Sequence, residues 1–134
     1  MKLHLSLAVK DFDSAIVFYT GLFKKDPKVV KDGYAKWDVD EPAVNFAICR
    51  NSNFQGVDHV GIQADSDDEL DDLADRVRDS GQPFLEMERI DCCHARMDKA
   101  WVKGIADEKW EVFLTHRHDL DQFGITQQEE IDSL

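Results

Sequence analysis

HLSLAVKDFDSAIVFY, residues 4–19, and HVGIQADSDDELDDLA, residues 59–74, share one layout that decides the fold. Each begins with a histidine, continues as an alternating strand, breaks at acidic residues and then enters a helix. In the first stretch the leucines occupy every second position, while His4, Ser6 and Ala8 face the other way. Self-similarity at a fixed distance predicts two copies of one structural unit.

Capping residues bound the two predicted helices. Asp11 precedes an apolar stripe with a period of about 3.6 residues, comprising Phe12, Ala15, Ile16, Tyr19, Leu22 and Phe23. Ser66 and Glu69 form a capping box ahead of the second helix, and Gly81 stands where that helix should end.

Three strand-like runs follow each helix. They cover 28–31, 34–39 and 43–49 in the first half, and 84–90, 94–103 and 109–115 in the second. The order β-α-β-β-β, twice, predicts an α+β fold in which a mixed sheet curls around a cleft. We expect one domain over 1–115, with repeats at about 1–55 and 56–115, followed by an acidic C-terminal tail at 116–134.

Composition narrows the classes of function. A net charge of −12 argues against binding to nucleic acid or to an anionic membrane, because phosphates would be repelled. No stretch approaches the roughly 20 apolar residues of a membrane span, and the amino terminus does not read as a signal peptide, so we expect a cytoplasmic protein. Three cysteines are an odd number and predict thiols rather than a disulfide framework.

The face of the sheet away from the helices is predicted to carry His4, His59, Glu111 and Asn45. Two histidines and one carboxylate are the ligands of a facial-triad iron site, which leaves positions open for dioxygen and substrate. The same ligands suit Mn, Co, Ni or Zn, so ligand type alone does not name the metal. The alternative is structural, with both histidines bonded to the backbone and Glu111 a charge at the rim.

Cys92 and Cys93 are adjacent, which is a poor arrangement for a disulfide because bridges need Cα atoms about 4.4–6.8 Å apart. In a regular strand their side chains would point to opposite faces. Both could reach one ligand from a turn, which Asp91 favours. Two thiolates there would suit a soft centre such as trivalent arsenic or cadmium. A buried core cysteine beside an exposed one, or a redox switch, are the alternatives.

Together these residues resemble the vicinal oxygen chelate superfamily, which includes glyoxalase I, extradiol dioxygenases and fosfomycin-resistance proteins. More narrowly, the chain resembles the organoarsenical carbon–arsenic lyases (the ArsI family), whose relatives are often labelled cadmium-induced proteins. The resemblance spans residues 2–113 and is carried by KLHLSLAVKDFDSAIVFYTGLF, GYAKWDV, DHVGIQ, DCCHARMDKAWV and WEVF.

The resemblance implies an Fe(II)- and dioxygen-dependent enzyme that cleaves the carbon–arsenic bond of a trivalent organoarsenical and releases arsenite. The implied catalytic and metal-binding residues are His4, His59 and Glu111, and the implied substrate-binding residues are Cys92, Cys93, His94, Lys99 and Asn45. The small organoarsenical and dioxygen are the expected partners, and the protein is expected to be a monomer or homodimer. The chain departs from the family at His94, where Tyr is usual, and at Met97, where Gln is frequent.

Two other functions would use only part of this set. A non-catalytic protein that sequesters cadmium or arsenite would need the paired cysteines but not the three metal ligands. A different metal-dependent enzyme of the superfamily, such as a glyoxalase-like isomerase or thiol transferase, would need the metal ligands and a fourth one. Asn45 holds the repeat position equivalent to Glu111, where a four-ligand enzyme would want a carboxylate, and this favours the lyase.

Overall fold

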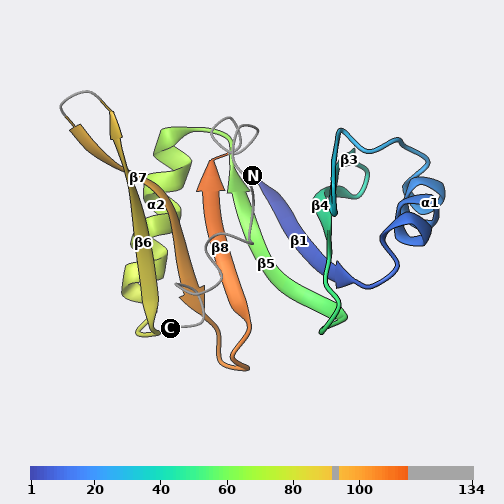
Figure 1. Ribbon diagram of the computed structural model, residues 1–134. Coiled ribbons are helices and arrows are strands. Elements are labelled where there is room, and N and C mark those ends of the chain that lie inside the picture. The colour runs from blue at the N-terminus through green and yellow to red at the C-terminus, as the bar shows by residue number, and fades with distance from the viewer. Residues whose placement is uncertain (92–93, 115–134) are drawn as a thin grey trace. The chain divides into compact units, whose positions relative to one another are not determined.

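A computed structural model describes residues 1–91 and 94–114, with the backbone alone described at 89–91 and 94–97 (Figure 1). The chain divides into two compact units. The first unit is Lys2–Val60, and the second unit begins at Gly61 and includes Met1. The predicted tail at 116–134 and the pair Cys92–Cys93 lie outside the described residues.

The first unit contains the first βαβββ repeat. Its elements are β1 (Lys2–Val9), α1 (Phe12–Phe23), β2 (Val29–Lys31), β3 (Tyr34–Asp40), β4 (Ala43–Arg50) and the start of β5 (Gly56–Ala64). The strands lie in the order β2-β3-β4-β1-β5, with β1 parallel to β4 and β3 antiparallel to both of its neighbours. The core of this unit is largely aromatic, with the Tyr19 and Phe46 rings 4.5 Å apart and Trp37 fully buried.

The second unit contains the rest of β5, α2 (Asp67–Asp79), β6 (Phe84–Asp91), β7 (His94–Lys103) and β8 (Lys109–Leu114). Its strands lie in the order β5-β8-β7-β6, and α2 packs against β7 and β8 (Figure 1). The buried residues of this core are Ala64, Leu70, Leu73, Val77, Ala100, Val112 and Leu114. The strand β5 therefore begins in one unit and ends in the other.

The predicted helix ends are confirmed. Asp11 accepts a hydrogen bond from the Ser14 N–H, and the Ser66 hydroxyl accepts one from the Glu69 N–H at 3.2 Å. Gly81 has φ +76°, a left-handed conformation that glycine adopts without steric cost at the end of a helix.

The predicted core stripe of α1 is wrong at Leu22, whose side chain is 61% exposed. Successive helical residues are rotated by about 100°, so Leu22 lies well to one side of the centre of the stripe at Phe12 and Phe23. It joins Val17 and Phe18 on the exposed side, because α1 is apolar on both faces while only one face meets the strands.

Burial in β1 follows the predicted alternation, but the side of the strand that carries His4 and Ser6 is more deeply buried than the side that carries the leucines. His4, Ser6 and Ala8 are at most 3% exposed, whereas Leu5 and Leu7 are half-buried against the α1 core. The face that carries His4 is therefore part of the packed interior.

Charge is unevenly divided along the chain. Residues 2–60 contain eight acidic and eight basic residues, so the net charge of −12 belongs to the remainder. Much of it lies on α2, whose first turn holds Asp67, Asp68 and Glu69. Among the described residues, no helix is both long enough and apolar enough to cross a membrane.

Candidate metal centre

The two predicted histidine ligands meet in the first unit. His4 comes from β1 and His59 from β5, and their side chains are 2% and 5% exposed. The Nε2 atoms of the two rings face each other at 3.0 Å.

The other nitrogen of each ring is held by an oxygen acceptor. His4 Nδ1 lies 3.1 Å from the main-chain carbonyl oxygen of Asn45, which can only accept, so this Nδ1 carries the proton. His59 Nδ1 lies 2.8 Å from Asp58 Oδ2, and an ionised carboxylate likewise only accepts. In the neutral rings both Nε2 atoms are then acceptors. Two acceptors 3.0 Å apart call for a cation or a proton between them, which fits a divalent metal that binds imidazole.

The predicted carboxylate ligand, Glu111, lies in the second unit on β8 and is 1% exposed. Its Oε2 accepts a hydrogen bond from Lys99 Nζ on β7 at 3.2 Å, and Lys99 is itself 2% exposed. A buried carboxylate needs a compensating positive charge, and Lys99 supplies one. Sequence reasoning grouped Lys99 with the substrate-binding residues and did not anticipate this contact.

Gly61, on β5, makes room for Glu111. A Cβ at position 61 would lie 2.5 Å from the Glu111 carbonyl oxygen and 3.4 Å from its Cβ. His59 and Gly61 are two positions apart on one strand and therefore point to the same face. The sequence contains a clue to this role, because a glycine inside an alternating strand often marks a close approach of another backbone.

The remaining predicted substrate-binding residues are placed only in part. Asn45 is 5% exposed on β4 and its carbonyl oxygen orients His4. His94 begins β7, with its backbone paired to that of Asp91, while Cys92 and Cys93 lie outside the described residues. The substrate-binding roles of all of them stay predictions.

The third cysteine, Cys49, belongs to a different environment. Burial, helped by the nearby charge of Asp58, raises the pKa of the Cys49 thiol to about 11. It is therefore protonated at neutral pH and is a poor ligand for a soft metal, since the thiolate is the binding form.

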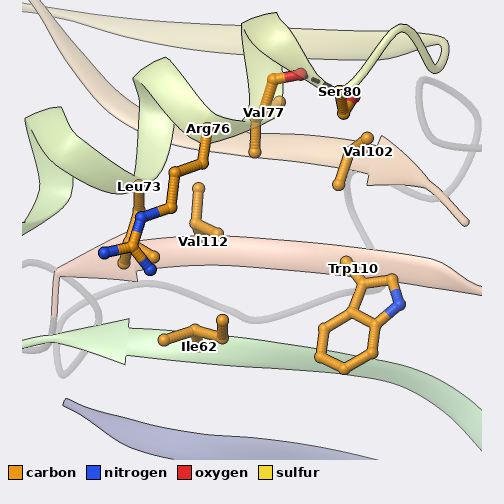
Figure 2. A pocket seen from close by; sticks show the side chains of 8 residues that line it. All are labelled: Ile62, Leu73, Arg76, Val77, Ser80, Val102, Trp110 and Val112. Carbon is orange, nitrogen blue, oxygen red and sulfur yellow. Dashed lines mark hydrogen bonds between the residues drawn. The ribbon is translucent and has the colours of Figure 1, made fainter.

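A cavity of about 170 Å³ lies on the helix side of the second unit (Figure 2). Its lining consists of Ile62, Leu73, Arg76, Val77, Ser80, Val102, Trp110 and Val112. Trp110 and Val112 flank Glu111 in β8 and so point to the opposite face of the sheet. This cavity is therefore separate from the buried carboxylate.

Comparison with known proteins identifies the family of the chain. Residues 3–125 match the glyoxalase/bleomycin resistance protein/dioxygenase superfamily. A trivalent organoarsenical cleaving enzyme of Thermomonospora curvata is 31% identical over 115 residues, which cover 84% of this chain and 76% of that protein. The cadmium-induced protein CadI of Mycobacterium tuberculosis is 32% identical over 124 residues, covering 92% and 81%.

Solved structures agree on the fold. The Mn(II)-bound glyoxalase of Novosphingobium aromaticivorans matches 83% of this chain and 37% of its own with a TM-score of 0.61 and 20% identity. An extradiol ring-cleaving dioxygenase of Brevibacterium fuscum matches 83% and 31% with a TM-score of 0.61 and 12% identity. The repeated βαβββ unit, the sequence match over nearly the whole chain and these structural likenesses lead to one conclusion: the chain belongs to the glyoxalase/bleomycin resistance protein/dioxygenase superfamily, the vicinal oxygen chelate proteins.

Proposed function

We propose that this protein is a cytoplasmic, Fe(II)- and dioxygen-dependent enzyme that cleaves the carbon–arsenic bond of trivalent organoarsenicals and releases arsenite. Support comes from relatives named trivalent organoarsenical cleaving enzyme at 31–33% identity. The observation that carries the metal-dependent part is the pair His4–His59, whose Nε2 atoms face each other while each Nδ1 is engaged by an oxygen.

In this proposal His4, His59 and Glu111 hold the metal, as two neutral imidazoles and one carboxylate suited to Fe(II). When bound, Fe(II) supplies a centre for activating dioxygen next to the substrate. Lys99 donates a hydrogen bond to Glu111 Oε2 and so fixes one of the carboxylate oxygens, which orients the proposed ligand before metal arrives.

Cys92 and Cys93 are assigned to the substrate. Two adjacent thiolates can bind one trivalent arsenic atom, which leaves its organic group directed away from the sulfur atoms. Fixing the arsenic in this way turns the reaction with dioxygen into one between positioned groups. The thiolates bind arsenic, whereas the nitrogen and oxygen ligands bind iron. Substrate binding and metal binding are therefore assigned to separate residues.

The test is a turnover assay on the full-length protein. Protein loaded anaerobically with Fe(II) receives a trivalent methylarsenical and then air, and released arsenite is quantified. We expect arsenite in excess of protein, lost in Glu111→Gln and retained in Glu88→Gln, which removes the same charge from an exposed position on β6. The double substitution Cys92→Ser/Cys93→Ser should abolish arsenical binding while Fe(II) still binds.

Two outcomes would contradict the proposal. Tight arsenical binding without arsenite release under Fe(II) and oxygen would identify a sequestering protein that uses only the cysteines. Arsenite release that is unchanged by Glu111→Gln and by chelation would exclude a role for the three proposed metal ligands.

A further inference from the structure

The two histidines of the pair are held by partners of different chemical kinds. The partner of His4 is a main-chain carbonyl, fixed by the parallel pairing of β1 and β4 in which His4 stands opposite Asn45. The partner of His59 is the carboxylate of Asp58, whose side chain is 27% exposed. Consecutive residues of a strand point to opposite faces, so strand geometry alone does not produce the Asp58–His59 contact.

The Asp58 contact decides where His59 keeps its proton. A neutral imidazole bears one N–H, and a carboxylate 2.8 Å from Nδ1 stabilises the tautomer with that N–H on Nδ1. A hydrogen bond to an ionised acceptor is stronger than one to a neutral acceptor. His59 is therefore the more strongly polarised of the two rings, with its Nε2 electron pair directed at His4 Nε2.

Without that carboxylate the pair can satisfy itself. His59 could then move its proton to Nε2 and donate it to His4 Nε2 across the same 3.0 Å. The resulting ring-to-ring hydrogen bond would occupy both nitrogen atoms that the metal needs. Asp58 opposes this arrangement because its carboxylate would lose the hydrogen bond that it accepts from the His59 Nδ1–H.

We propose that Asp58 is a positioning residue that holds His59 in the Nδ1–H tautomer and so keeps the histidine pair ready for a divalent metal. The metal-binding part of this inference rests on the proposed function, whereas the tautomer can be measured without metal. Outer partners of this type commonly change metal affinity by about 10–100-fold.

The experiment uses the full-length metal-free protein, with ¹⁵N-labelled histidine observed by NMR, followed by titration with Co(II). We expect His59 in wild type to carry its proton on Nδ1 and to move it toward Nε2 in Asp58→Ala, while His4 serves as an internal reference. Co(II) affinity should fall about 10–100-fold in Asp58→Ala. Asp58→Asn, whose amide oxygen can still accept the bond, should keep the tautomer and lose less affinity.

Asp32→Asn is the matched control for charge, because it removes one carboxylate from the same unit at a side chain that is 96% exposed. An Nδ1–H tautomer that persists in Asp58→Ala, or an equal loss of Co(II) affinity in Asp32→Asn, would overturn the inference. A wild-type protein that binds no metal at all would instead refute the proposed function, with the tautomer shift still reporting on Asp58.

Discussion

Gly61→Ala tests the tight fit between β5 and Glu111. The new methyl group would lie 2.5 Å from the Glu111 carbonyl oxygen, whereas a comfortable carbon–oxygen contact is about 3.3 Å. The neighbouring backbone would have to move by roughly 0.8 Å, since a main-chain oxygen cannot rotate away. Overpacking of this kind destabilises the folded protein by about 1–3 kcal/mol. Alanine also makes the unfolded chain less flexible than glycine does, which offsets about 0.4–1 kcal/mol of that loss. We expect a net loss of about 1–2 kcal/mol of stability.

Gly21→Ala is the control, because a Cβ at that position in α1 meets nothing within 4 Å. Alanine there should stabilise the helix by up to about 1 kcal/mol, so the same substitution should act with opposite sign at the two glycines. Urea unfolding would measure both changes, and scanning calorimetry should show a shift of about 3–5 °C per kcal/mol.

Gly61→Ala should also lower activity, because displacing Glu111 by a fraction of an ångström misplaces the proposed metal ligand. Arsenite release and Co(II) affinity should both fall, while Gly21→Ala leaves them unchanged. A Gly61→Ala protein as stable and as active as wild type would refute the steric argument.

Three further results are expected. Lys99→Met removes the buried cation hydrogen-bonded to Glu111 and should cost the metal-free protein about 3–5 kcal/mol in urea unfolding, partly restored by metal; an unchanged midpoint would contradict this. In Cys92→Ser/Cys93→Ser, the remaining Cys49 thiol has a pKa raised from 9.0 to about 11, so iodoacetamide at pH 8 should modify it at least about 10-fold more slowly than in the urea-unfolded chain. Comparable rates would show an ordinary thiol. The hydrogen-bonded Lys2 ammonium lowers the pKa of Asp38 below 3.8. The Lys2–Asp38 pair therefore stabilises the folded protein fully above pH 3.8, and this stabilisation is lost as pH falls through the lowered pKa of Asp38 in the folded protein. The stability difference from Asp38→Asn, under about 1 kcal/mol for this partly exposed pair, should therefore shrink as pH falls below 3.8, and a difference that does not change with pH would contradict the assignment.

Local sequence determined much of the fold. Asp11, Ser66 and Gly81 act through hydrogen bonds or backbone angles that involve only near neighbours, so their roles could be predicted from composition at those positions. Strand alternation likewise placed His4 and His59 on one side of their strands. The position of Leu22 was mispredicted because periodicity gives the direction of a side chain but not the width of the surface it packs against.

The contacts around the predicted site depend on pairing between strands. Lys99 reaches Glu111 because β7 and β8 pair with Trp101 opposite Glu111, which places Lys99 diagonally across on the same face. That register depends on the geometry of the turn between Lys103 and Lys109, where Asp107 adopts a positive φ, as well as on the strands that flank it. The Asp58–His59 contact was missed for a different reason, since strand alternation predicts opposite directions for the two side chains.

The uneven division of charge has a kinetic consequence. Residues 2–60 are neutral in sum, while α2 and the rest of the second half carry the excess of carboxylates. A divalent cation in solution would be drawn toward that half by a long-range attraction that dissolved salt weakens. Under the proposed function, metal uptake should therefore slow as ionic strength rises. A chain with its α2 carboxylates neutralised would hold metal about as firmly once loaded but would acquire it more slowly.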